Sequence, residues 1–426
     1  MQEPDMQTLR VRDVFVPGGY PRYTYQDRKK FQIEEKLRDA LERLNKLIAV
    51  AGPTKSGKTV LVRRVVDLAD RVWIEGGHIK SISDVWALIG DALGIPNSKT
   101  EANSISEENG KSYEIDSSFK PVGIGGGTKA SEIDKDAKSQ TLSRTFGSVA
   151  SKAAVDALLR ERKVLVIDDF HYLPAELQSE LVRALKPAVF EGLQVVLILI
   201  PHRMHEAARA EMDLDGRTVT IPIPEWQPEE LFSIGETGFD QLRLSYLPST
   251  IDHLVRETFC SPHLMQDFCS SLCNKCNIKE EYRGESPGPR IALPVDSSEF
   301  FQSFAQSISP EAFKALRKGP DRTNRKDRDL NAGGTCDTYE AVLLALHELG
   351  ASTPVDWTLL RRALQVVLKD VPQQHEVTRA LEKMDEIAKD LQGEPVIDYA
   401  NGELHLVEPF FRYYLKWNTQ IMDEAT

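Results

Sequence analysis

The sequence predicts an α/β fold with a parallel sheet, followed by a helical region and a C-terminal domain of winged-helix type. Three observations indicate this. Apolar runs of strand length alternate with helix-length segments over the first half of the chain, the order typical of a parallel sheet covered on both faces. A glycine-rich loop separates the first run from the helix that follows it. Near the C-terminus, three helix-length segments precede two short strands.

Composition narrows the class of protein. The chain has 426 residues, 41% hydrophobic and 28% charged, which fits two or three globular domains. No apolar stretch approaches 18 residues and the polar N-terminus lacks the pattern of a signal peptide, so we expect a cytoplasmic protein with no membrane segment. The net charge of −12 disfavours a non-specific nucleic-acid binder but leaves a local basic patch open. Five cysteines do not indicate a disulfide framework.

The glycine-rich loop follows an apolar run at residues 47–51 and precedes a segment of helical character. Strand, glycine loop and helix in this order are the setting of a P-loop, whose backbone N–H groups and helix N-terminus bind phosphate. Lys58 is expected to reach the β- and γ-phosphates of a nucleoside triphosphate, and the Thr59 hydroxyl to ligate Mg²⁺. The expected nucleotide-binding residues here are Gly52, Pro53, Thr54, Lys55, Ser56, Gly57, Lys58, Thr59 and Val60.

A pair of aspartates ends a second apolar run, residues 164–167, which predicts a central parallel strand. Chemistry in α/β sheets lies at the carboxyl ends of the strands. Asp168 is therefore expected to hold Mg²⁺ through water, and Asp169 to orient or deprotonate the attacking water. Asp169 is shorter than the Glu that many hydrolytic P-loop enzymes carry, which favours slow turnover. A strand that simply ends in a turn is the alternative.

Further runs predict the remaining strands of the sheet, with helices between them. Strands are expected at residues 70–76, 194–200 and 217–224. Helices are expected at residues 81–94, 143–161, 174–187 and 203–212. Residues 97–142 interrupt this pattern and predict an insertion, either a partner-facing hairpin or a disordered loop.

The C-terminal segments predict helices at residues 338–349, 355–369 and 373–391, then a hairpin with Asn401-Gly402 at its turn. The third helix carries five acidic against three basic residues. A helix that enters the major groove should be basic or neutral, so we expect this domain to face protein or nucleotide. His405 in the hairpin could contact nucleotide or simply pack.

Two other clusters admit two interpretations each. Basic residues at 318–328 could touch phosphates or an acidic partner, although a solvated loop is the more frequent explanation. Cys269, Cys273 and Cys276 share one helical face, which indicates an apolar helix face more than a metal site.

Together these motifs resemble the AAA+ ATPases, in the branch shared by origin-recognition-type ATPases and STAND ATPases (signal-transduction ATPases with numerous domains). The resemblance implies ATP as the nucleotide, since no guanine-specifying motif appears. Arg203 follows the fourth strand, where STAND proteins often carry Arg and other AAA+ enzymes Asn. Arg217 occupies the place of an arginine finger that reaches a neighbouring subunit's γ-phosphate. A surface arginine is the alternative for Arg217.

Three outer segments extend the resemblance. Residues 21–28, which end in Arg28, are similar to the segment that packs on adenine in this branch. Residues 260–266 resemble the Gly-x-Pro motif of the helical lid, with Pro262 near the base or ribose and Ser261 in place of the usual glycine. Residues 407–417 resemble the end of the winged helix. The implied domains are an N-terminal segment (1–28), the ATPase core with its insertion at about 97–142 (29–225), the lid (226–280), a linker (281–335) and the winged helix (336–418).

The resemblance implies a nucleotide-controlled switch. ATP and Mg²⁺ bind, and hydrolysis or exchange changes the domain arrangement and hence homo-oligomerisation. Because no effector domain is evident, we expect the output to fall on a separate partner protein, and family-level analogy places such switches in phage defence. The alternative is a DNA-associated ATPase of replication-initiator or transposition type. A third interpretation is a scaffold that binds ATP and barely hydrolyses it.

Overall fold

The computed structural model describes residues 8–95, 151–200, 218–308, 310–320, 326–391 and 395–418. These residues form two compact units. One consists of Glu34–Ala51 and Leu61–Pro222, and the other of Met1–Ile33, Gly52–Val60 and Ile223–Thr426. Among the residues so described, no helix has the length and apolar character needed to span a membrane.

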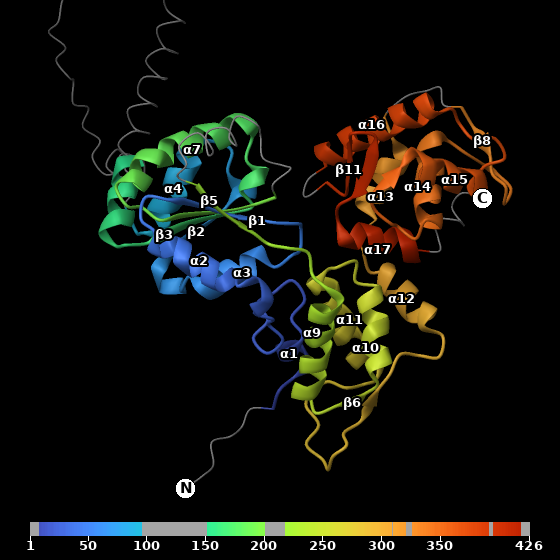
Figure 1. Ribbon diagram of the computed structural model, residues 1–426, viewed down its shortest axis with the longest axis horizontal. Helices are drawn as coiled ribbons and strands as arrows, with labels where there is room; N and C mark the ends of the chain where they lie inside the picture. Colours follow the sequence, from blue (N-terminus) through green and yellow to red (C-terminus); the bar gives the residue numbers. More distant parts are fainter. Residues whose placement is uncertain are drawn as a thin grey trace, which may run out of the picture. The chain divides into compact units, whose positions relative to one another are not determined.

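The first unit is built on a five-stranded sheet in the order β2-β3-β4-β1-β5, and all its strand pairs are parallel (Figure 1). Its strands are β1 (Leu47–Ala51), β2 (Arg71–Glu75), β3 (Val164–Asp168), β4 (Val195–Leu199) and β5 (Thr218–Pro222). Every residue of β1, β3 and β4 is buried, as expected of central strands rich in Val, Ile and Leu. β2 alternates between buried and half-buried residues because it lies at one edge. The predicted parallel sheet is confirmed.

Helices cover both faces of this sheet (Figure 1). They include α2 (Ile33–Glu42), α3 (Lys58–Val65), α4 (Ile82–Ala92), α7 (Ala175–Phe190) and a helix over residues 151–160. Short 3₁₀ turns occupy Leu68–Asp70, Gly76–His78 and Phe170–Tyr172. Alternate residues of β1 pack in one core cluster with side chains of α4 and α7. The helix predicted at 203–212, the insertion at 97–142 and the first part of the helix predicted at 143–161 lie outside the described residues.

The second unit begins with a helical part. It contains α1 (Val11–Val14), a 3₁₀ turn (Lys29–Phe31), α9 (Pro228–Gln241), α10 (Pro248–Arg256), α11 (Pro262–Lys275), α12 (Ser297–Ala305) and the parallel pair β6 (Ser245–Tyr246) and β7 (Arg290–Ile291). Phe15 packs against Phe239 with ring centroids 5.4 Å apart. Cys269 and Cys273 are fully buried in this core, which confirms the apolar helix face. No cluster of three metal-ligating side chains occurs in the part of the chain that the structure describes.

The same unit ends with a second helical cluster and a small sheet. Its elements are α13 (Glu311–Lys318), β8 (Arg328–Asp329), β9 (Thr335–Cys336), α14 (Thr338–Glu348), β10 (Val355–Asp356), α15 (Trp357–Val367), α16 (Gln374–Asp390), β11 (Ile397–Ala400), β12 (Glu403–Leu406) and α17 (Pro409–Trp417). The three predicted helices and the hairpin are confirmed, with Asn401 and Gly402 at positive φ in its turn. The start of the second helix was predicted two residues early, because Val355 and Asp356 pair with β12 and Asp356 then caps the helix.

Candidate nucleotide-binding site

The glycine-rich loop, Gly52–Val60, directly follows β1, and α3 begins at Lys58. Two of its glycines are required for different reasons. A Cβ placed at Gly52 would lie 2.8 Å from the Cβ of Ile223, so only glycine allows this close approach. Gly57 has φ +89°, which L side chains rarely adopt, and the space around it is open. The loop therefore has the backbone freedom that phosphate binding requires.

Three polar side chains of this loop, Thr54, Ser56 and Lys58, are buried. Lys58 is only 7% exposed, and its Nζ donates to the carbonyl oxygens of Gly52 at 3.2 Å and Pro53 at 2.6 Å. The Thr54 and Ser56 hydroxyls are buried and find no hydrogen-bond partner within the described chain. A buried polar group without a partner costs about 1–3 kcal/mol. A ligand rich in oxygen acceptors would satisfy these hydroxyls, and the loop fits a phosphate group.

The aspartate pair ends β3. Asp168 is buried, and its Oδ1 accepts from the N–H of Asp169 at 3.0 Å. Asp169 has φ +52°, so the chain turns sharply there. Because β1, β4 and β3 are parallel neighbours, Ala51 and Asp168 end their strands at the same edge of the sheet. That edge is where α/β proteins bind their ligands.

Gly76 packs closely against this aspartate turn, which the sequence did not predict. A Cβ at Gly76 would lie 2.4 Å from the carbonyl oxygen of Asp169 and 3.0 Å from that of Asp168. Gly77 beside it has nothing within 4 Å of such a Cβ. No signal in the sequence distinguishes the two glycines, since the contact joins segments far apart along the chain.

Arg28, expected to pack near the adenine, is engaged by protein groups. Its guanidinium forms a bidentate pair with Glu230, at 3.0 and 2.9 Å, and donates to the carbonyls of Pro224 at 2.9 Å and Glu225 at 2.8 Å. It also lies over the ring of Trp226, 4.6 Å from the centroid. Arg28 thus fastens the N-terminal segment to residues 224–230.

Trp226 links that segment to the P-loop. Its indole N–H donates to the carbonyl oxygen of Ser56 at 2.9 Å, and the residue is 8% exposed. Sequence reasoning missed Trp226, because nothing in its neighbours marks a tryptophan that contacts a loop 170 residues away.

Pro262, expected near the base or ribose, is the first residue of α11. Ser261 caps this helix by accepting from the N–H of Leu264 at 3.3 Å, and its φ of −100° needs no glycine. The positive φ values fall instead on Phe259 and Cys260, just before it. Ser in place of the expected glycine therefore has a local structural reason.

His263, next to Pro262, is a further residue that the sequence did not reveal. Burial, with a smaller effect of Lys55, lowers the pKa of His263 to about 4, and burial raises the pKa of Asp267 to about 6. The His263 Nε2 lies 3.5 Å from Asp267, but at neutral pH the imidazole is uncharged and this contact is no ion pair. Burial raises the pKa of Glu408, and the charge of Lys55 opposes this rise to a smaller extent.

Other expected site residues divide into two groups. Arg203 and Arg217 lie outside the described residues, as do Arg322 and Arg325 of the basic segment. Arg328 of that segment is buried and pairs with Glu376 at 3.0 Å, so for this residue both a solvated loop and a partner contact were wrong. His405 is part-exposed and lies 3.7 Å from Glu403.

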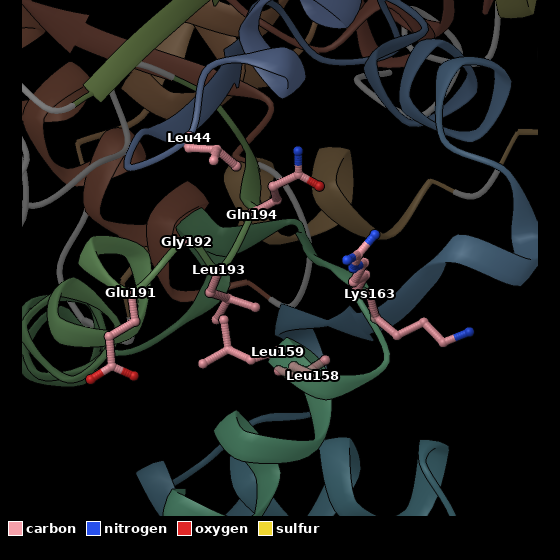
Figure 2. Close-up of a pocket in the computed structure, with 9 residues that line it drawn as sticks. Leu44, Leu158, Leu159, Lys163, Glu191, Gly192, Leu193 and Gln194 are labelled. Carbon is pink, nitrogen blue, oxygen red and sulfur yellow. The ribbon is translucent and has the colours of Figure 1, made fainter.

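One cavity in the first unit is separate from these residues. It has a volume of about 470 Å³ and is lined by Leu44, Leu158, Leu159, Arg162, Lys163, Glu191, Gly192, Leu193 and Gln194 (Figure 2). Lys163 and Gln194 directly precede β3 and β4, so the cavity lies at the edge of the sheet opposite Asp168. It is not the candidate nucleotide site.

A protein-family model matches the part of the chain that carries this site. Residues 42–206, which hold the P-loop and both aspartates, match a family described as AAA domain. This segment is an AAA domain. No curated protein matches the sequence.

Solved structures extend the likeness beyond the AAA domain. The Walker-type ATPase of Pyrococcus abyssi aligns at 14% identity and a TM-score of 0.50, over 92% of this chain and 95% of that one. Cdc6p from Pyrobaculum aerophilum aligns at 14% identity and a TM-score of 0.44, over 98% and 100%. The Orc1 protein of Aeropyrum pernix, solved in complex with DNA, aligns at 12% identity and a TM-score of 0.44, over 96% and 97%. At these identities the likeness concerns the fold alone: a P-loop NTPase core with a helical C-terminal region.

Proposed function

We propose that this protein binds and hydrolyses ATP with Mg²⁺ at the P-loop of its AAA domain. The observation that supports this most is the loop itself. Lys58 is buried at its end, and the buried Thr54 and Ser56 hydroxyls have no hydrogen-bond partner among the described residues. Backbone N–H groups and the N-terminus of α3 add positive potential for phosphate.

The proposed roles follow from residue chemistry. Lys58 binds the β- and γ-phosphates, while Thr59 and Asp168 would hold the magnesium ion. That ion, when bound, neutralises negative charge on the phosphate oxygens. Asp169 orients the attacking water and accepts its proton, and its short side chain predicts slow turnover. Arg203 and Arg217 remain proposed contacts to the γ-phosphate, the latter from a neighbouring subunit.

Titration calorimetry with ATP and ADP, paired with a phosphate-release assay, tests this proposal. Wild type should bind ATP and release phosphate slowly. Asp169→Asn should bind ATP with wild-type affinity and lose phosphate release. Failure of wild type to bind ATP in the presence of Mg²⁺ would overturn the proposal, and unchanged release by Asp169→Asn would remove Asp169 from the mechanism.

We further propose that ATP controls assembly, in the manner of the STAND and origin-recognition branch. The proposed domains, in chain order, are an N-terminal segment (1–28), the core (29–225), the lid (226–280), a connection (281–335) and the winged helix (336–418). Contacts of α17 with both helical clusters support a coupled movement. The output is proposed to be a homo-oligomer acting on a separate protein, with phage defence as the setting by family analogy.

The surface of α16 supports a protein-facing domain. Lys383 pairs with Glu386, and Lys389 lies 2.6 Å from Asp385 and 3.6 Å from Asp398. Because neighbouring acids already neutralise these bases, α16 offers little positive charge to a DNA groove.

A DNA-associated ATPase is the second candidate, favoured by α15. Arg361, Arg362 and, just beyond the helix, Lys369 are exposed, and they could contact phosphates. The test is the affinity for duplex DNA at salt concentrations from about 50 to 200 mM. An affinity that falls steeply with salt, roughly in proportion to the number of phosphates neutralised, would support this candidate. Absence of duplex binding at low salt would exclude it.

A further inference from the structure

Trp226 touches the P-loop at one peptide, and that contact defines a role for it. We propose that Trp226 is a positioning residue of the nucleotide site, whose indole N–H fixes the Ser56–Gly57 peptide so that the Gly57 N–H faces the phosphate. This inference rests on the proposed ATP site and deepens it. The contact is buried, with 2.9 Å between the indole nitrogen and the Ser56 oxygen.

Peptide geometry gives the reason. The Ser56–Gly57 peptide is not among the cis bonds of the described chain, so its C=O and N–H point in opposite directions. When the Ser56 oxygen accepts from Trp226, the Gly57 N–H points away from the indole. In a P-loop, phosphate oxygens accept from backbone N–H groups that the loop turns inward.

This peptide needs such a restraint. Gly57 has φ +89° and open space where a Cβ would lie, so the glycine backbone can adopt several orientations and carries no side chain that would restrain it. Rotation of the peptide would turn the Ser56 oxygen, rather than the Gly57 N–H, toward the phosphate. A carbonyl oxygen in that place repels an anion. The indole N–H disfavours this rotation, because rotation would leave a buried donor without its acceptor.

The Arg28 side chain restrains the Trp226 indole. The Arg28 guanidinium lies 4.6 Å from its ring centroid and is bound to Glu230 and to the carbonyls of Pro224 and Glu225. A charge packed on the ring and anchored at several points leaves Trp226 little freedom. The sequence of contacts thus runs from Arg28 to Trp226 and from there to the Ser56–Gly57 peptide.

Trp226→Phe removes the N–H and keeps most of the ring, so it tests the contact directly. The matched control is Trp86→Phe. Trp86 is similarly buried, 5% exposed, but packs in the core under the sheet, and no hydrogen bond from its indole to another described residue is seen. ATP affinity by titration calorimetry and melting temperature without nucleotide are measured for both variants and wild type.

We expect Trp226→Phe to bind ATP about tenfold more weakly than wild type and Trp86→Phe, a change of about 1.4 kcal/mol. Its melting temperature should equal that of the Trp86→Phe control. Affinity within twofold of the control would overturn the inference and leave the ATP site intact. If wild type itself binds no ATP, the proposed function fails and this inference with it.

A second measurement does not depend on the folding of Trp226→Phe. Phosphate binding at the Gly57 N–H polarises the peptide and strengthens the indole hydrogen bond, so ATP should change tryptophan emission. That change should keep most of its amplitude when Trp73, Trp86, Trp357 or Trp417 is replaced singly by Phe. Loss of the change in any of these four variants, or no change in wild type that binds ATP, would contradict the proposed contact.

Discussion

At the scale of single residues, the candidate site is centred on the buried lysine of its P-loop. Lys58 is buried and donates to carbonyl oxygens of its own loop. A phosphate can replace these acceptors, because an ammonium binds an anion more strongly than it binds a neutral carbonyl. We therefore expect the Lys58 ammonium to lie near the position of the bound phosphate even before the nucleotide binds.

Lys58→Ala should weaken ATP binding by roughly ten- to a hundredfold, the range of one charge-assisted hydrogen bond of about 1.5–3 kcal/mol. Calorimetric titration of ATP measures this. Lys36→Ala is the matched control, since it removes the same charge from an exposed position of α2. Equal losses in the two variants would mean that net charge, rather than the P-loop lysine, governs binding.

Gly76→Ala should slow phosphate release while ATP still binds. The new Cβ would lie 2.4 Å from the Asp169 carbonyl oxygen, so the aspartate turn must shift, at a cost of about 1–3 kcal/mol in unfolding free energy. Gly77→Ala meets open space and should behave as wild type in both assays. If both variants release phosphate at the wild-type rate, the position of Asp169 does not limit turnover.

At the scale of elements, the strands could be predicted because each central one is a continuous apolar run. β10 could not, since two residues carry no periodicity and it forms only by pairing with β12. The P-loop and Asp168 could be predicted because their spacing is local. Gly76, Trp226 and His263 could not, because their contacts with Asp169, Ser56 and Phe410 join segments far apart in the sequence.

Burial of Asp267 on α11 predicts a pH-dependent stability. Its pKa is raised to about 6, above the usual value of 3.8, so its stabilising contribution is complete below pH 3.8 and is lost as the pH rises through 6. Asp267→Asn should therefore raise unfolding free energy at pH 7.5, by about 1 kcal/mol after solvent screening of this half-buried group, and by less at pH 4.5. Urea unfolding at both pH values measures the difference.

Asp252→Asn on α10 is the control for that experiment, because it removes a carboxylate from an exposed position of a neighbouring helix. A gain for Asp267→Asn that is the same at both pH values would show that removal of the charge is not its cause.

Helix α17 connects two cores of the second unit. Phe411, Tyr414 and Leu415 belong to the C-terminal core, and Tyr413 belongs to the core of α9–α12. Glu257, from the segment after α10, accepts from Lys416 Nζ at 2.7 and 2.9 Å and from Trp417 Nε1 at 2.7 Å. Because this helix contributes side chains to both cores, we expect the two clusters to move together.

Glu257→Gln should lower unfolding free energy by about 1–3 kcal/mol, because it removes the charge from this buried acceptor. Thermal or urea unfolding measures it. Lys416→Met combined with Glu257→Gln should cost less than the sum of the two single changes, since both disrupt one contact. Additive effects would show that the carboxylate and the ammonium do not stabilise each other.

At the scale of the whole molecule, residues of the C-terminal half contact the P-loop of the AAA domain. Residues 1–33 and 223–426 form one compact unit with Gly52–Val60. Trp226 contacts Ser56, and the charge of Lys55 affects the pKa of both His263 and Glu408. We therefore expect a phosphate bound at the loop to change the electrostatic environment of α11 and of the start of α17, the elements proposed to change position.

Mass by light scattering, without nucleotide, with ADP and with ATP, tests that central claim most directly, on wild type and Lys58→Ala. We expect wild type to form a larger assembly with ATP than with ADP or without nucleotide. The Lys58→Ala variant should keep the same mass in all three conditions. A wild-type mass that is the same in all three conditions, at ATP concentrations shown to saturate the site, would contradict control of assembly by nucleotide.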